Sequence, residues 1–359
     1  MAWQGAAVRV IPNRFDLAQK EGTEATYTLR LESDRDETED VRLYVGDWLR
    51  TEDGEHDWGV PANGARWTFD RVLAADEVVV LRYRWTAEAG GELEGSFQTG
   101  IPQVGGRISG PKNPEDGAVP EEAEPGAVVL ISRAFEGRDV TLTVRTLVDV
   151  QGLTLYEVAS DAALFESLES SGAQFATVAR SCTSWIELSQ DRATLDPGAT
   201  REITVSVKTP LAFEGSYWSA VFVESQPEIV EQSGTRVLTI PRAAIKVFVT
   251  ASGTEAVAGL VTGFDVSATE PLTLAATFQN AGNVEVAVSG VAEVIDRTGT
   301  VVRRYPLAEV KVLPGGTRRL VIGDAEGAAG LPSGIYQAVV RLEYGGESPV
   351  AGVRAFRVP

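Results

Sequence analysis

A turn followed by two strands recurs along this chain and strongly limits what it can fold into. One copy is Leu195-Asp-Pro-Gly198 followed by Gly215-Ser-Tyr217, and another is Leu313-Pro-Gly-Gly316 followed by Gly334-Ile-Tyr336. Proline fixes φ at one corner of such a turn, and glycine supplies the positive φ at the next corner. We therefore expect a turn, an alternating strand, and then a later strand whose aromatic ring covers a core.

A third, weaker copy lies nearer the N-terminus, where Leu73-Ala-Ala-Asp-Glu77 precedes Gly95-Ser-Phe97. The distance from the turn glycine to the glycine of Gly-x-Tyr is 17 residues in one strong copy (198 to 215) and 19 in the other (315 to 334). Similar spacing with matching chemistry argues against coincidence. Three copies of one unit predict three copies of one domain.

Short alternating segments such as Tyr27-Thr-Leu-Arg-Leu31 and Ile203-Thr-Val-Ser-Val207 place one face in a core and the other toward water. Glycine-rich turn markers separate them. Short strands at this spacing predict an all-β chain of tandem immunoglobulin-like β-sandwiches, three in number.

The expected boundaries follow from the repeats and from one biased segment. Residues 111–126 contain four prolines and a cluster of acids, which is typical of an exposed linker or long loop. We expect a sandwich with tryptophan-rich, acidic loops over 1–104, a linker over 105–126, and sandwiches over 127–252 and 253–359.

One helix is expected in the second of these sandwiches. Ser160 is a suitable N-cap for residues 161–169, Leu164 and Leu168 lie four apart, and Gly172 is a suitable terminator. The simplest interpretation is a short crossover between the two sheets.

Charge and composition exclude several functions. The formal net charge is −19 at a sequence pI near 4.6, which disfavours binding to nucleic acid or anionic lipid. No stretch approaches the roughly 20 apolar residues of a membrane span. A catalytic cysteine would normally need a histidine, and the only histidine, His56, lies in a polar turn, whereas the only cysteine is Cys182. We therefore expect no enzyme and no cofactor.

Two acidic loops are weak candidates for Ca²⁺, which prefers clustered carboxylate oxygens. They contribute Asp34 and Asp36 from one loop and Asp53 and Asp57 from the other. Neither loop has the twelve-residue helix–loop–helix spacing, and a solvated acidic hairpin is the simpler interpretation.

Trp48 and Trp58 flank the second acidic turn. An exposed pair there would form a platform for a sugar or a peptide, whereas buried tryptophans would belong to the core.

The segment 235–250 is the strongest candidate for binding a partner. Pro241 cannot donate a ladder hydrogen bond, so the strand is kinked or lies at a sheet edge there. An edge with alternating apolar residues can accept a partner's strand, although an ordinary last strand fits the pattern too. The partner-binding candidates in this segment are Arg236, Val237, Leu238, Ile240, Ile245, Val247 and Val249.

Several segments together resemble a known group of proteins. They are Phe15-Asp-Leu17, residues 47–54, Ser184-Trp-Ile186, residues 242–249 and residues 331–336. These resemble segments of bacterial extracytoplasmic proteins related to the periplasmic pilus-assembly (PapD-like) chaperones. Such chaperones have two domains and a basic pair that holds the client's terminal carboxylate. The sequence does not assign that pair here, and a third sandwich departs from the pattern.

The resemblance implies a non-catalytic, chaperone-like or scaffolding protein that assembles a bacterial surface structure such as a pilus, acting on a secreted or pilin-like subunit. The alternative is an adhesive or structural surface module that binds glycan or wall polymer. Residues 1–5 do not have the pattern of a leader peptide, so the chain is either cytosolic or a mature form. The architecture favours an extracytoplasmic location with the leader removed.

Overall fold

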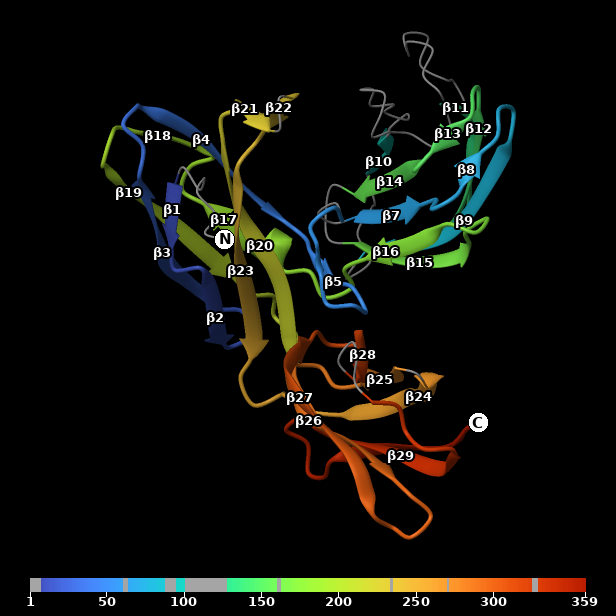
Figure 1. Ribbon diagram of the computed structural model, residues 1–359. Helices are drawn as coiled ribbons and strands as arrows, with labels where there is room; N and C mark the ends of the chain where they lie inside the picture. The colour runs from blue at the N-terminus through green and yellow to red at the C-terminus, as the bar shows by residue number, and fades with distance from the viewer. Residues whose placement is uncertain are drawn as a thin grey trace.

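The computed structural model describes residues 8–60, 64–87, 95–100, 128–159, 163–232, 235–269, 271–324 and 329–359. Strands dominate these residues and form three β-sandwiches (Figure 1). The fold class is all-β, as predicted. Each sandwich has its own buried apolar cluster, because alternating side chains of two facing sheets meet there.

The first sandwich is assembled from two segments that are distant in the sequence. Leu29 of one segment lies opposite Ile203 of the other, and both are fully buried. One sheet has the order β1 (Val8–Ile11), β3 (Glu24–Ser33), β19 (Thr200–Lys208), β17 (Ile186–Leu188). The other has the order β18 (Arg192–Leu195), β4 (Glu39–Gly46), β20 (Ser216–Ser225), β23 (Arg242–Ala251), β2 (Arg14–Gln19).

The second sandwich lies between these two segments in the chain, over residues 64–177. One sheet has the order β10 (Gly95–Gly100), β14 (Thr154–Ala159), β7 (Gly64–Thr68), β16 (Gln174–Thr177). The other has the order β11 (Val128–Glu136), β12 (Asp139–Thr146), β9 (Val78–Ala87), β15 (Ala163–Glu169). The short strands β8 (Val72–Leu73) and β13 (Val150–Gln151) pair at one end. We call this unit the inserted sandwich.

The expected boundaries 1–104 and 127–252 are therefore wrong, because they cut both sandwiches. Strand β4 pairs with β20, so that Val45 lies opposite Val221, and β7 pairs with β14. Alternation in the sequence identifies strands but does not say which distant strand is the partner. The expected linker over 105–126 lies outside the described residues.

The helix expected over 161–169 is also wrong, since β15 occupies Ala163–Glu169 and pairs with β9. Phe165 enters the core while Leu164 and Leu168 remain exposed, which is the period of a strand. Tertiary pairing overrides the local helix pattern here.

The third sandwich spans 259–358. One sheet has the order β24 (Gly259–Thr269), β25 (Leu272–Asn280), β28 (Thr317–Gly323), and the other has the order β27 (Val301–Val312), β26 (Val286–Ile295), β29 (Gly334–Glu343), β30 (Val350–Val358).

The recurrent turns have the expected geometry. Gly198 and Gly315 have φ of 67° and 72°, and Tyr336 is buried in its core. In the weaker copy Asp76 takes φ of 62°, the place that glycine holds in the other turns.

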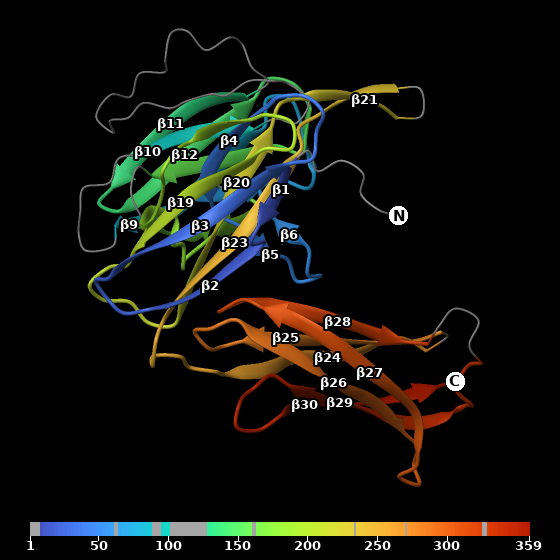
Figure 2. The ribbon, with the colours of Figure 1, turned by 90° about the vertical axis from the view of Figure 1, so that its left-hand side faces the viewer.

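The three sandwiches meet around one short segment. The hairpin of β5 (Leu49–Arg50) and β6 (His56–Asp57) leads from β4 into the inserted sandwich and touches the third sandwich, where Arg319 N–H donates to the Glu52 carbonyl at 2.8 Å. Figure 2 shows the third sandwich beneath this hairpin and the ends of β2 and β23. A second tie is the Ser216 N–H, which donates to the Asn283 carbonyl at 2.7 Å.

Candidate functional site

Strand β23 has an open edge over its first four residues. On one side it pairs with β20 along its length, and on the other side β2 pairs with it only from Lys246 onward. Among the described residues, no strand pairs with that second side over 242–245. An exposed strand edge of this kind is a ready template for another strand.

The backbone groups that are free at this edge can be named. The Ser225 N–H donates to the Pro241 carbonyl, and antiparallel partners alternate between hydrogen-bonded and non-bonded pairs. Ala243 and Ile245 therefore direct their backbone groups at β20. Arg242 and Ala244 direct theirs to the open side.

A projecting hairpin extends the same edge. Strands β21 (Glu228–Gln232) and β22 (Thr235–Thr239) pair with each other and stand away from the sandwich (Figure 1). Ile229 and Ile240 are 58% and 49% exposed, and Arg236 is exposed. The Arg35 guanidinium holds the hairpin base through Glu228 at 2.6 Å. The edge thus carries apolar side chains that are free to contact a partner.

Basic side chains gather where the open edge ends. Strand β2 runs parallel to β23 with Arg14 beside Lys246, and neighbouring strands lie only about 4.8 Å apart. Arg14 pairs with Asp16 at 2.7 Å and with Glu285 of the third sandwich at 2.9 Å, and its guanidinium covers the Phe248 ring. Two adjacent cations thus face the junction with the third sandwich.

The β5–β6 hairpin adds a third cation and the only histidine. His56 Nε2 accepts hydrogen bonds from Lys246 Nζ at 2.6 Å and from Arg50 Nη2 at 3.2 Å. Burial, followed by the charges of Lys246 and Arg50, lowers the pKa of His56 to about 4. The imidazole is therefore neutral at pH 7, as an acceptor for two cations must be. We call Arg14, Arg50 and Lys246 the basic cluster.

Positive charge in this cluster exceeds what its surroundings neutralise. Burial, and then the charges of Arg50 and Arg14, lower the pKa of Lys246. Arg50 Nε is buried and donates to no acceptor among the described residues. The basic cluster can therefore accept an anionic group that the described part of the chain does not supply.

Aromatic rings pack against the basic cluster and against His56. Trp48 is fully buried, donates from Nε1 to the Ser219 carbonyl at 3.1 Å and lies 4.9 Å below the Lys246 ammonium. Trp58 stacks on His56 with ring centroids 5.1 Å apart. These rings belong to one buried cluster on the outer face of the β4–β20–β23 sheet, and Leu313 of the third sandwich joins it.

These positions change the predicted site. Because Trp48 is buried, the expected platform of exposed Trp48 and Trp58 does not form. Ile245, Val247 and Val249 point into the core of the first sandwich and cannot contact a partner with their side chains. Ile240 and Arg236 are exposed, and Val237 and Leu238 lie in β22.

The sequence did not reveal Arg14, Arg50, Lys246 or Glu285. The one usable signal was that Lys246 is among only five lysines and stands in an apolar strand. The parallel pairing of β2 with β23, which places Arg14 beside it, has no signature in the sequence.

The calcium candidates are not brought together. Within the described residues, no group of three or more acids, histidines or cysteines could hold a metal ion. Asp57 instead pairs with Arg66 at 2.5 Å and accepts the Gly59 N–H at 3.0 Å. Cys182 is fully buried, and burial raises its thiol pKa to about 12, so the thiolate is inaccessible at neutral pH.

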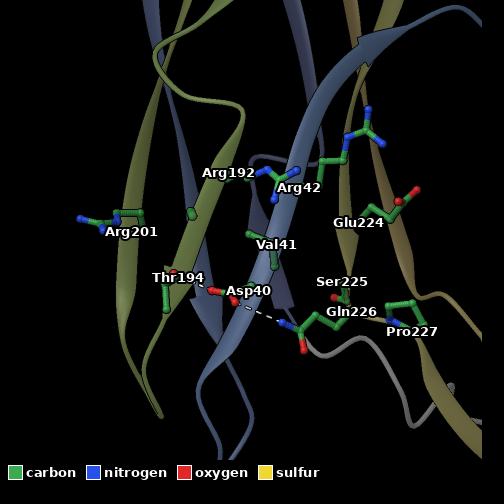
Figure 3. Close-up of a pocket in the computed structure, with 11 residues that line it drawn as sticks. Asp40, Val41, Arg42, Arg192, Thr194, Arg201, Glu224, Ser225, Gln226 and Pro227 are labelled. Atoms are coloured by element: carbon green, nitrogen blue, oxygen red, sulfur yellow. Dashed lines mark hydrogen bonds between the residues drawn. The ribbon is translucent and has the colours of Figure 1, made fainter.

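A cavity of about 560 Å³ lies at the base of the projecting hairpin, on the sheet that carries the open edge (Figure 3). Asp40 holds its floor together by accepting from Thr194 Oγ1 at 2.6 Å and from Gln226 Nε2 at 3.1 Å. Arg42 and Arg192 are cross-strand neighbours there. Both acidic and basic side chains line this cavity, so its charge does not favour an anionic or a cationic ligand.

The described residues hold no helix long and apolar enough to cross a membrane. No protein-family model matches the chain, and no curated protein matches it in sequence. Solved structures that match the chain include the chaperone–tip adhesion subunit complex of archaic chaperone-usher pili of Acinetobacter baumannii, at 9% identity, with 98% of each chain covered and a TM-score of 0.35. A chaperone–tip adhesin complex of CFA/I fimbriae biogenesis matches at 10% identity, 97% and 99% coverage, and a TM-score of 0.34. The Salmonella enterica SafA pilin–SafB chaperone complex matches at 9% identity, 98% and 99% coverage, and a TM-score of 0.33.

Proposed function

We propose that this protein is a non-catalytic binding protein that captures an extended segment of another protein by strand addition. The observation that supports this is the open edge of β23, where Arg242 and Ala244 direct backbone groups to a side on which no strand of the described residues pairs. Main-chain hydrogen bonds give affinity in this mode, and side-chain pockets give specificity. Ile229 and Ile240 supply exposed apolar contacts beside that edge.

We propose further that the partner strand ends at the basic cluster. Strand β2 takes over the edge at Lys246 and runs parallel to β23. A partner strand that is also parallel would meet Arg14 end on, so its C-terminal carboxylate would lie beside Arg14 and Lys246. Cation–carboxylate hydrogen bonds of this kind are among the stronger ones in proteins.

The particular role we propose is that of an extracytoplasmic, chaperone-like or scaffolding factor in assembly of a bacterial surface structure such as a pilus. Its partner would be a secreted or pilin-like subunit. The glycan-binding alternative depended on an exposed tryptophan pair, and the burial of Trp48 removes that support.

Proline substitution at the open edge tests strand addition. Ala244→Pro removes an N–H that points away from β20, so the fold should tolerate it while partner binding falls at least tenfold. Ala244→Ser is the matched control and should bind like the wild type. The proposed role predicts that a secreted subunit is encoded beside this protein. The assay is titration with that subunit, together with circular dichroism of each variant. Unchanged binding by a folded Ala244→Pro protein would eliminate the edge as the binding site.

A further inference from the structure

A carboxylate of the third sandwich contacts the basic cluster. Glu285 stands just before β26 in the third sandwich, and its side chain is only 7% exposed. Its Oε2 accepts from Arg14 Nη2 at 2.9 Å, whereas Oε1 is buried and accepts no hydrogen bond from the described residues. Burying a carboxylate oxygen without a hydrogen-bond donor costs free energy, so the Glu285 side chain lacks one of the hydrogen bonds that it could make.

Glu285 acts on all three cations of the cluster. Burial lowers the pKa of Lys246 and of Arg50, and the charge of Glu285 opposes that shift at both residues. Asp16, the other acid bonded to Arg14, is 64% exposed and belongs to the same strand. Glu285 is thus the buried anion that reaches the cluster across the junction.

Among the described residues, the charged ends of Arg50 and Lys246 hydrogen-bond to the neutral His56 ring and, from Arg50 at 3.5 Å, to the Gly54 carbonyl. Both cations also lie over the Trp48 ring. In the described part of the chain, neither forms an ion pair with a carboxylate. Glu285 is therefore one carboxylate shared by several cations. Those cations could bind a second carboxylate beside Glu285, or a partner's carboxylate in place of Glu285.

We propose that Glu285 is an internal ligand of the basic cluster, which a partner's terminal carboxylate must displace in order to bind. This inference rests on the proposed function and concerns the regulation of that site. Displacement would break the tie between Arg14 and the third sandwich, while the Ser216–Asn283 and Arg319–Glu52 bonds remain. Since coupling between two binding events is reciprocal, whatever loosens this junction should also favour the partner.

Lysine labelling tests the proposal without the natural partner. The chain has five lysines, so trace acetylation followed by mass spectrometry reports Lys246 against Lys20, Lys208 and Lys311 as internal controls. The probe is N-acetylglycine, which carries a free terminal carboxylate, at constant ionic strength. N-acetylglycinamide, which lacks the charge, is the control ligand.

The compared proteins are the wild type, Glu285→Gln and the matched control Glu293→Gln, which removes an acid paired with Arg304 elsewhere on the third sandwich. We expect N-acetylglycine to protect Lys246 selectively, with a half-protecting concentration at least tenfold lower in Glu285→Gln than in the other two. Glu285→Asp, which keeps the charge but shortens the side chain, should fall between them and serves if the glutamine variant does not fold.

Two results would overturn the proposal, and they differ in meaning. Equal half-protecting concentrations in the wild type and Glu285→Gln would show that Glu285 does not compete, while the carboxylate site itself would stand. Absence of selective Lys246 protection in every protein would remove the carboxylate site, and the internal ligand with it.

Discussion

Replacing Trp48 with alanine should destabilise the first sandwich severely, although sequence reasoning allowed this residue to be an exposed binding platform. The side chain is fully buried among Trp58, Phe248 and His56, with ring centroids 5.3–6.0 Å away. It also connects β4 to the hairpin that leads into the inserted sandwich. Its loss therefore removes packing at the place where the chain leaves one sandwich for the next.

The magnitude can be worked from these contacts. Burying a tryptophan removes roughly 150–250 Å² from water, worth about 4–6 kcal/mol at about 25 cal/mol/Å². The lost Nε1 bond to the Ser219 carbonyl adds about 1 kcal/mol, and partial collapse of the cavity returns some of the total. We expect Trp48→Ala to lower the free energy of unfolding by about 4 kcal/mol, and Trp48→Phe by roughly half of that.

Urea unfolding followed by far-ultraviolet circular dichroism measures this, because the midpoint of the first-sandwich transition should fall. Trp185→Ala, a substitution in the core between the two sheets of the same sandwich, calibrates the cost of losing a buried tryptophan there. A loss below about 1 kcal/mol for Trp48→Ala would refute the assignment of Trp48 to a buried junction.

Three further predictions follow from the junction and from the inserted sandwich. Gly215 has φ of 65° and a Cβ there would lie 2.4 Å from Asn283, so Gly215→Ala should destabilise by about 1–3 kcal/mol and enlarge the radius of gyration measured by X-ray scattering. Gly54 has φ of 89°, so alanine is strained there too, but Gly54→Ala should loosen the same junction more mildly, because the atoms that its Cβ meets are the flexible end of Arg318 rather than backbone. Burial raises the pKa of Glu157 to about 7, above its value in the unfolded chain, so the folded state holds the extra proton between about pH 4.5 and 7. Stability should therefore fall as pH rises through that window, by up to about 1.4 kcal/mol per pH unit, and urea midpoints of Glu157→Gln should lack this slope.

Local signals in the sequence predicted the strands and turns well. The positive φ of Gly198 and Gly315 follows from the Pro-Gly turns, and alternation predicted β3 and β19. The prediction failed at 163–169. Leu164 and Leu168 fit one face of a helix, but Phe165 is the residue that is buried in the core. Local periodicity is ambiguous over seven residues, and the pairing with β9 decided it.

Part of the candidate site could be predicted from the sequence, and part of it could not. Pro241 predicted either a kink or a sheet edge, and the open edge of β23 begins directly after it. The inward position of Ile245 and the burial of Trp48 were not predictable, because one register sends a side chain to the core and the next sends it to solvent.

The sequence by itself determined an all-β chain, the three turn units and the phase of most strands, because these depend on residues close together in the chain. Tertiary structure alone decided that one sandwich is inserted within another, since β4 and β20 pair as neighbouring strands although the whole inserted sandwich separates them in the chain. Tertiary structure also formed the basic cluster, because it brings together Arg14, Arg50 and Lys246 from three strands. Glu285, which contacts this cluster, comes from another sandwich. Charges that distant in sequence leave no local pattern, and only the packing of strands and domains brings them together.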